Sequence, residues 1–358
     1  MSAIREQEHL IKVHFDKMIV KMKELSSSSS AGRVDMEKMF NCVAFDIIGD
    51  LAFGSSFGAL DRYEYHAYMV GVFKNLKVFS MFQRLSVFPW ALRAMGLLMQ
   101  AIPAAVKGRA QHFAFAAERV KDRIASQTER RDFFWYILQH NEKSERGLSR
   151  EEMYANAGLL IGAGSETTAT LLSGTTYHLL RNPHVLYRLT REVRNAFATD
   201  ADIDIARASQ LPYLVAVMEE GMRLYPPGPA ANVRVTNHAT LVDGVLVPGG
   251  VRVAVQPWTA HRAESNFFDA EGFRPERWLP GADKVFALDR RDAVQPFSYG
   301  PRNCIGKSLA YAEMYTAMAR TLFNFDMRLC EESRDWIEQA AFIFWDKGPL
   351  WVELTPRK

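Results

Sequence analysis

The segment FSYGPRNCIGKSLA, residues 297–310, decides the fold of this chain. Cys304 stands just before a predicted helix, where unpaired backbone amides and the helix dipole favour a thiolate. Gly300 and Gly306 bracket the cysteine and let the backbone approach a bulky flat ligand closely. Arg302 adds a permanent cation within two residues. A thiolate in such a glycine-lined loop is a good axial ligand for haem iron, because it donates electron density that favours O–O cleavage.

The other cysteines and the composition limit the classes of protein to which this chain can belong. Cys42 and Cys330 are predicted to be buried free thiols, which is also the alternative for Cys304 taken alone. Three cysteines cannot build a disulfide framework and fit a reducing compartment, and no CxxC or HExxH motif indicates zinc. With 358 residues, 48% hydrophobic and 24% charged, the chain has ordinary globular composition. A net charge of +3 is too small to indicate nucleic acid as the main partner.

A second motif, LLIGAGSETTAT at residues 159–170, lies within the longest predicted helix. Glycines inside a helix cost about 1 kcal/mol each against alanine, so Gly162 and Gly164 need a reason. Close passage over a planar cofactor is one, and a helix–helix packing face of small residues is the alternative. A dinucleotide-binding loop is a weaker rival, because the third glycine and the preceding strand are missing. Glu166 and Thr167 place an acid and a hydroxyl beside these glycines, and a threonine bonded to a carbonyl one turn back can bend the helix.

Helices dominate the periodic pattern. The long helix has a capping box formed by Ser149 and Glu152 and stops at Pro183, a length of roughly 50 Å. Asp35 is the predicted N-cap of a helix that ends near Phe53. Further helices are predicted over residues 2–24, Leu60–Phe82, Ala104–Gln127, Arg130–His140, 184–198, Pro212–Leu224 and Gly306–Phe323. The serine-rich stretch Ser26–Gly32 is expected to be a linker.

Strands are expected only in the last third of the chain, over Val233–Val235, Ala239–Val247, Val251–Val255, Phe342–Trp345 and Leu350–Leu354. Asp243-Gly244 and Lys347-Gly348 are predicted turns. The fold class is therefore mainly α with small β-sheets (α+β), and residues 1–358 are expected to form one domain. The apolar stretch Leu85–Val106 contains two prolines and an arginine. It is interpreted as buried helix, with a surface-lying helix that touches a membrane as the alternative.

The first motif resembles the haem-binding signature FxxGxRxCxG of cytochrome P-450 monooxygenases. The resemblance implies a P-450 fold that binds haem b, iron protoporphyrin IX, with an axial thiolate. It makes Cys304 the proximal iron ligand, pairs Arg302 with a haem propionate and packs Phe297 beside the sulfur, with Gly300 and Gly306 in the same signature.

The 159–170 segment is similar to the oxygen-activating motif of that family. The resemblance implies that Thr167 steadies dioxygen and that Glu166 helps to relay protons to it. Arg234, in the segment PPGPAANVRV, corresponds to an arginine that often reaches a propionate, although Asn232-Val233 replaces a common Leu-Pro pair.

The third motif, EEGMR, places Glu220 and Arg223 three residues apart on one helix. By itself it is typical of a solvated pair worth about 0.2–0.5 kcal/mol. Together with FRPERW, residues 273–278, it resembles the buried Glu-Arg-Arg triad of the family, with Arg277 as third member and a structural role. His261 also matches a family position and is interpreted as a residue that supports the fold.

The resemblance is strongest to fungal members that oxidise secondary metabolites, through FDIIGDLAFG at residues 45–54. Family members usually begin with a membrane anchor, early strands and a helix that carries a tryptophan and an arginine toward the propionates. This sequence begins beyond them, so we expect an N-terminally truncated member, and Trp90 lies in the wrong region to substitute.

The implied activity is insertion of one atom of O2 into a lipophilic small molecule, with electrons from an NADPH-cytochrome P-450 reductase that docks near Lys307. The alternatives are a non-catalytic fragment with weak or no haem binding, and a haem isomerase or dehydratase, against which Glu166 and Thr167 argue. The resemblance indicates the surface of the endoplasmic reticulum membrane. Because this chain carries no recognisable anchor or transmembrane segment, a cytoplasmic location is the alternative.

Overall fold

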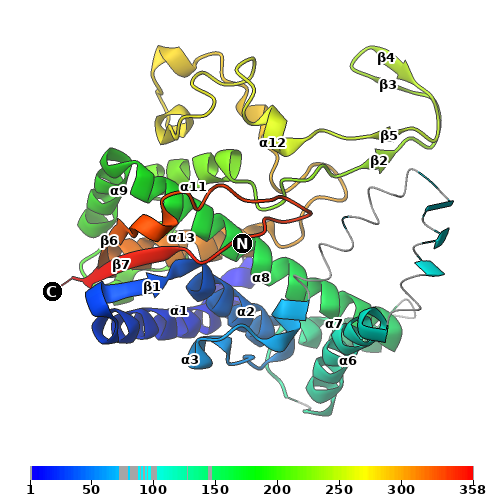
Figure 1. Ribbon diagram of the computed structural model, residues 1–358. Helices are drawn as coiled ribbons and strands as arrows, with labels where there is room; N and C mark the ends of the chain where they lie inside the picture. The colour runs from blue at the N-terminus through cyan, green and yellow to red at the C-terminus, as the bar shows by residue number, and fades with distance from the viewer. Residues whose placement is uncertain are drawn as a thin grey trace.

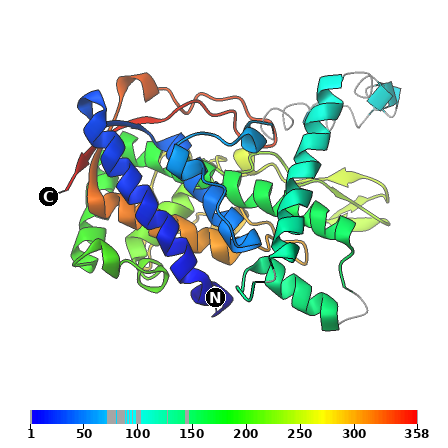
Figure 2. The ribbon, with the colours of Figure 1, turned by 90° about the horizontal axis from the view of Figure 1, so that it is seen from below.

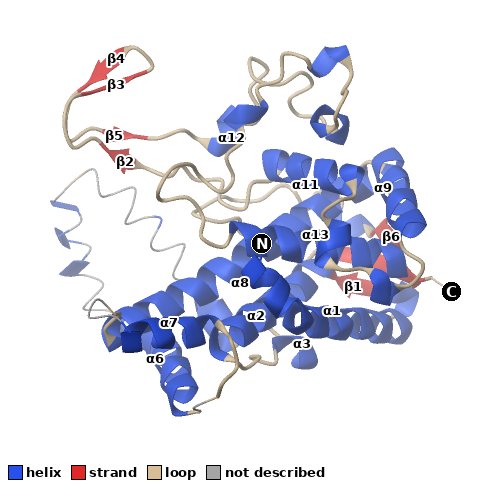
Figure 3. Ribbon diagram, turned by 180° about the vertical axis from the view of Figure 1, so that it is seen from behind, coloured by secondary structure: helices blue, strands red, loops and turns tan. Residues whose placement is uncertain are grey.

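The computed structural model describes residues 2–71, 103–126, 128–143 and 147–357, with residues 80, 88, 90, 91, 93, 94, 96 and 97 between them. Helices form the body of the molecule, and the strands are short (Figures 1 and 3). The described helices are α1 (Ser2–Ser28), α2 (Met36–Phe53), α3 (Ala59–Arg62), α6 (Pro103–Ala125), α7 (Phe133–Lys143), α8 (Arg150–Arg181), α9 (Pro183–Ala196), α10 (Ile205–Ala208), α11 (Pro212–Leu224), α12 (Pro257–Ala260) and α13 (Lys307–Asn324). The mainly α class predicted from the sequence is confirmed.

Helix α8 is the centre of this body. It packs against α2, α6, α11 and α13, and its second half is buried almost continuously. The predicted capping box is confirmed, since Ser149 Oγ accepts from Glu152 N while the Glu152 carboxylate accepts from Ser149 N at 2.8 Å. Nearly every residue of α2 is buried, and α1 lies across the body beside α2 and α13 (Figure 2). A 32-residue helix is therefore covered on several sides.

The N-terminus of α2 is fixed by the side chain predicted to cap it. Asp35 Oδ1 accepts from Lys38 N at 3.3 Å and also from Leu350 N at 3.0 Å. Burial raises the pKa of this carboxyl group. The side chain of Asp35 thus caps the start of α2 and also bonds this helix to the C-terminal part of the chain.

Strands from both ends of the chain form a three-stranded antiparallel sheet. β7 (Trp351–Pro356) lies in the middle, between β1 (Arg33–Asp35) and β6 (Phe325–Leu329). Val352 faces the core and pairs with Val34 on one side and Leu329 on the other. Neither β1 nor β6 is predicted from the sequence.

Two small ribbons project from the helical body, and we call residues 233–255 the strand arm (Figure 1). β2 (Arg234–Val235) pairs with β5 (Arg252–Val253), and β3 (Thr240–Val242) pairs with β4 (Val245–Val247) across the predicted Asp243-Gly244 turn. Both turn residues have positive φ, 48° and 78°. Nearly all residues of these four strands are exposed.

Three predictions of regular structure or linkers are wrong, and residues 347 and 348 do not form the predicted turn. The predicted helix over Leu60–Phe82 is interrupted, because α3 ends at Arg62 and Tyr63 adopts a left-handed φ of 50°; residues 72–79, 81 and 82 lie outside the described residues. Phe342–Trp345 contributes only an isolated bridge, not a strand. The Ser26–Gly32 linker is partly helical, because Ser26 and Ser27 hydroxyls bond to Lys23 O and continue α1. The prediction for Leu85–Val106 falls largely outside the described residues.

Candidate active site

The cysteine loop is held by its own backbone. Cys304 N donates to Phe297 O at 2.9 Å, and Asn303 N donates to Gly300 O at 3.0 Å. Gly300 has a φ of 82°, a value that glycine adopts at no steric cost. The loop leads through Gly306, the N-cap, into α13. These bonds fix the position of Cys304 relative to a long buried helix.

The thiol of Cys304 and its surroundings are uncovered. Cys304 is exposed, whereas Cys42 and Cys330 are buried as predicted. Burial raises the pKa of Cys42 to about 12, which keeps it an inert thiol. A Cβ added at Gly300 would meet no atom within 4 Å, and the neighbouring Ile305 is 96% exposed. The loop therefore presents sulfur, backbone and apolar side chains on an open surface.

The glycines of α8 serve different purposes. A Cβ at Gly164 would lie 2.8 Å from Ile48 Cδ1, and one at Gly174 would overlap the ring of Tyr225. These two glycines allow helix packing, which was the alternative interpretation of the motif. Gly162 has open space where its Cβ would be. Gly162, unlike Gly164 and Gly174, therefore leaves room beside the helix for a ligand.

Glu166 and Thr167 point to different surroundings, although they are adjacent. Thr167 is partly exposed, and its hydroxyl donates to Ala163 O at 2.7 Å, the bond to the preceding turn expected from the sequence. Glu166 is 3% exposed. Its Oε1 accepts from Thr170 Oγ1 at 3.1 Å and binds Lys347 Nζ. The acid of the motif is thus enclosed beneath α8, not placed in an open groove.

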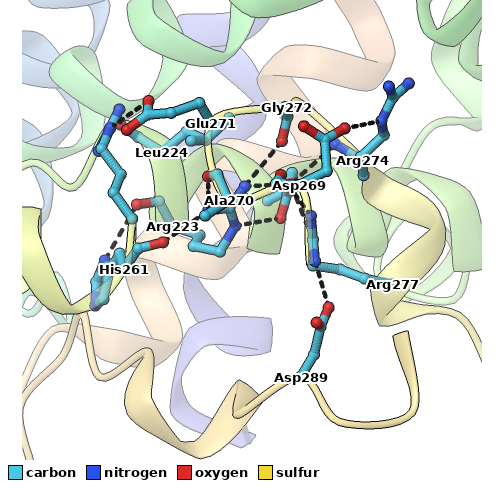
Figure 4. Close-up of polar contacts among 12 residues, drawn as sticks. Arg223, Leu224, His261, Asp269, Ala270, Glu271, Gly272, Arg274, Arg277 and Asp289 are labelled. Atoms are coloured by element: carbon cyan, nitrogen blue, oxygen red, sulfur yellow. Dashed lines mark hydrogen bonds and ion pairs between the residues drawn. The ribbon is translucent and has the colours of Figure 1, made fainter. Parts of the chain in front are cut away.

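The structure brings the three triad residues together. Arg223 donates to both oxygens of Glu220, at 2.7 and 2.8 Å, and Arg277 Nε donates to Glu220 Oε1 at 3.2 Å. All three side chains are fully buried, so the solvated interpretation of EEGMR is wrong. Asp289 binds Arg277 as a second carboxylate (Figure 4). The network therefore contains two acids and two guanidinium groups.

Arg223 also ties this network to surrounding backbone. It donates to the carbonyl oxygens of His261, Ala270 and Gly272 at 2.6–2.9 Å (Figure 4). His261 Nδ1 lies 3.1 Å from Arg223 O, and burial lowers the pKa of this imidazole to about 4. His261 is therefore neutral near pH 7, in keeping with a fold-supporting residue.

Two arginines predicted to meet propionates flank the cysteine loop. Arg234, on β2, reaches the loop through a 3.4 Å hydrogen bond from Nη2 to Ser298 Oγ. Arg302 is exposed within the loop itself. Lys307 Nζ lies 5.6 Å from the centre of the Phe297 ring, next to Tyr311. The structure thus gathers cations around the face that carries Cys304.

A cavity of about 560 Å³ lies between the base of the strand arm and the segment before β7. Its described lining is largely apolar and includes Ala230, Val233, Val253, Trp258, Phe342 and Trp345. Neither Cys304 nor Thr167 belongs to that described lining. This cavity could not be predicted from the sequence, because its lining residues come from segments far apart in the chain.

Comparison with known proteins identifies the family. The model of the cytochrome P450 family matches residues 1–349. The chain is 42% identical to the cytochrome P450 monooxygenase astJ of Aspergillus oryzae, over 99% of this chain and 70% of the relative. It is 40% identical to the trichothecene C-4 hydroxylase of Trichoderma arundinaceum, over 99% and 72%, and to the averantin hydroxylase of Dothistroma septosporum, over 99% and 67%.

The chain belongs to the cytochrome P450 family. This P450 is similar to monooxygenases of fungal secondary metabolism and spans about 70% of their length. Membership implies a haem-thiolate cofactor, a substrate, O2 and a reductase. Among the described residues of this P450, no helix is both long and apolar enough to cross a bilayer.

One group of the site was missed from the sequence. Lys347 follows the pattern of a solvated turn, yet its side chain is only 3% exposed and contacts Glu166 and Glu37. No local signal distinguishes this lysine from an exposed one, because its partners lie about 180 and 310 positions earlier in the chain.

Proposed function

We propose that this chain is a haem-thiolate monooxygenase that inserts one atom of O2 into a lipophilic fungal secondary metabolite, with Cys304 as the axial ligand. The observation that carries the proposal is the exposed thiol of Cys304 in a loop closed by its own amide, beside open space at Gly300. When bound, haem supplies the activation of O2 and the transfer of one oxygen atom.

The residues around Cys304 fit a haem in their chemistry. A haem needs a sulfur ligand, apolar contact with its flat faces and cations for its two carboxylates. Gly300 and Gly162 leave space for a flat group, while a Cβ at Gly306 would lie 3.8 Å from Cys304 Sγ. Ile305 and Phe297 supply apolar surface. We assign the two carboxylates to Arg302 and Arg234, which flank the same loop.

Two residues of α8 are assigned to handling protons. Thr167 keeps its hydroxyl proton directed at Ala163 O in this structure, and we assign it to holding a proton at Oγ1 beside dioxygen. Glu166 is assigned to taking up a proton at its carboxylate and then releasing it toward Thr167. A positioned acid of this kind contributes typically ~10²–10⁴-fold to rate.

The substrate class is proposed from the relatives, and the cavity beside the strand arm supports it, although neither Cys304 nor Thr167 belongs to the described lining of that cavity. A volume of about 560 Å³ falls within the usual range for small-molecule sites of about 300–1,000 Å³. Its lining by Val233, Trp258 and Phe342 favours a lipophilic compound. Two of the similar proteins are named as hydroxylases of averantin and of trichothecene C-4, which supports hydroxylation as the reaction type.

Electrons must come from a partner, because no nicotinamide- or flavin-binding motif occurs in the sequence. We propose an NADPH-cytochrome P450 reductase that docks beside the cysteine loop, where Arg302 and Lys307 are exposed and would attract an acidic surface. We further propose that residues 1–358 act as one catalytic domain and that the enzyme works at the surface of the endoplasmic reticulum membrane. The Glu220–Arg223–Arg277 network has a structural role in it.

Reduced carbon-monoxide difference spectroscopy tests the proposal. The haem-supplemented chain is expected to show the red-shifted Soret band of a thiolate ligand, and Cys304→Ser is expected to abolish it. Cys330→Ala, which changes a buried thiol outside the motif, is the matched control and should retain the band. A wild-type chain without this band would instead be a non-catalytic fragment, and a band that survives in Cys304→Ser would refute the assignment of the ligand.

A further inference from the structure

We propose that Lys347 is the positioning residue for Glu166, and that Glu37 shares the same ammonium group. This inference deepens the proposed function and rests on it, because it concerns the acid assigned to proton transfer. It adds a residue from the C-terminal segment to a site otherwise built from α8 and the cysteine loop.

The contacts of Lys347 leave its ammonium group little freedom. Nζ binds Glu166 Oε1, donates to Thr170 Oγ1 at 2.6 Å and lies 3.7 Å from Glu37 Oε1. Thr170 Oγ1 in turn donates to the same Glu166 oxygen at 3.1 Å. Glu166, Thr170 and Lys347 therefore form a closed ring of contacts that fixes one carboxylate oxygen.

The second carboxylate oxygen of Glu166, Oε2, lacks the contacts that Oε1 makes. Oε2 is buried and has no hydrogen-bond partner among the described residues. A buried oxygen left without a donor loses its hydration and gains no hydrogen bond in return, so this arrangement needs a reason. Fixing Oε1 with Lys347 leaves Oε2 as the oxygen available to exchange a proton.

Glu37 competes with Glu166 for the ammonium group of Lys347, so the charge of Glu37 changes the strength of the Lys347–Glu166 contact. Both carboxylates are almost fully buried, and one ammonium group serves them. Glu37 has further donors in Asn41 Nδ2, at 2.7 Å, and the Tyr65 hydroxyl. Burial raises the pKa of Glu37 to about 7, against the attraction of Lys347. When Glu37 is neutral, Lys347 serves Glu166 alone; when it is ionised, the two acids compete.

The test compares Lys347→Met with Lys347→Arg, which keeps a cation. In Lys347→Met the buried Glu166 loses its counter-charge and should take up a proton. Infrared difference spectroscopy of the purified, haem-free chain should then show a protonated-carboxyl C=O band that disappears in Lys347→Met/Glu166→Gln. Lys347→Arg should lack this band. Absence of any Glu166-dependent band in a folded Lys347→Met would overturn the proposal.

The haem-loaded enzyme gives an independent readout. In Lys347→Met, substrate oxidation should fall at least about tenfold, a small part of the ~10²–10⁴-fold that a positioned acid contributes, while NADPH consumption continues and ends in peroxide. The carbon-monoxide Soret band should be unchanged. Lys347→Arg should restore most of the coupling between NADPH consumption and substrate oxidation. Unchanged coupling in Lys347→Met would refute the positioning role.

A milder variant covers the case in which Lys347→Met does not fold. Thr170→Val preserves shape and removes the hydroxyl that bridges Lys347 and Glu166, and it should raise the peroxide fraction by about fivefold. Thr176→Val is the matched control, because Thr176 lies buried on the same helix and its hydroxyl has no partner among the described residues. Equal peroxide fractions in the two variants would refute the proposal. If the wild-type chain lacks the thiolate Soret band, the proposed function fails, while the infrared comparison still tests the Lys347 contact.

Discussion

The helical body and the strand arm place their residues in opposite ways. In the body, charged side chains such as Arg223 and Arg277 are completely buried and fully paired. In the arm, Leu241 and Leu246 are 70% and 66% exposed, although both are apolar. A pair of short strands is marginal alone in water. The body is therefore stabilised by its own long-range contacts, whereas the arm has pairing between its strands but little burial.

The largest expected effect is the loss of a buried carboxylate from the body. Glu220→Ala leaves Arg223 without its bidentate partner and removes one of the two carboxylate partners of Arg277, which should lower the free energy of unfolding by about 3–5 kcal/mol. Denaturant titration measures this change. Asp292→Ala is the control, because it breaks an exposed pair with Arg290 and should cost under about 1 kcal/mol. Similar losses in the two variants would contradict the distinction between buried and exposed pairs.

The next effect separates the two uses of glycine in α8. Gly174→Ala forces a methyl group against the Tyr225 ring and should destabilise the chain by about 1–3 kcal/mol. Gly162→Ala meets open space and should gain up to about 1 kcal/mol from helix propensity. Thermal unfolding of the two variants should show a lower melting temperature for Gly174→Ala and an equal or higher one for Gly162→Ala. A loss in both would mean that Gly162 is packed as tightly as Gly174.

The body also contains a buried acid that makes its stability depend on pH. Burial raises the pKa of Glu313 to about 8 from an ordinary 4.5. Between those values the folded chain holds a proton that the unfolded chain has released, so stability falls as pH rises, by at most about 1.4 kcal/mol per pH unit. Glu313→Gln should flatten this fall, most clearly between pH 7 and 8, because Glu37 contributes a similar fall only up to about pH 7. The prediction is contradicted if the free energy of unfolding of Glu313→Gln falls with pH as steeply as that of the wild-type chain.

The smallest expected effect lies in the arm. Replacing Leu241 and Leu246 by serine should change the free energy of unfolding by no more than about 0.5 kcal/mol, because both side chains are already exposed. Light scattering should show less self-association, since exposed apolar edges favour it. The matched body variant, Leu322→Ala, removes a side chain that is 1% exposed and should cost about 2–5 kcal/mol. A comparable loss from the arm would show that those leucines are covered.

Local signals account for what the sequence predicted correctly in the fold. The Asp35 cap and the Ser149–Glu152 capping box depend on residues three positions apart, and both are confirmed. β1 and β6 were missed because they are short and are defined by pairing with β7, far away in the chain. The predicted strand at Phe342–Trp345 is wrong because its residues line a cavity and do not pair along a sheet.

The residues of the site differ in the same way: those in short motifs could be predicted, and those defined by long-range contacts could not. Cys304 and Thr167 could be named from short motifs, and their roles stay predictions. The burial of Glu220 and Arg223 could not be read from their spacing, because an i,i+3 pair has the same sequence whether it is solvated or enclosed. Lys347 was mistaken for a turn residue for the same reason. Its environment is created by α2 and α8, which no local pattern around residue 347 encodes.

The middle position of β7 has a consequence for synthesis. Because Val352 pairs with both Val34 and Leu329, the two outer strands have no shared partner until the ribosome has added residues 351–356. A nascent polypeptide stalled before that point would hold α1, α2 and α8 with their sheet still open. Pulse-labelled chains released at residue 340 should therefore be more sensitive to protease than chains released at residue 358.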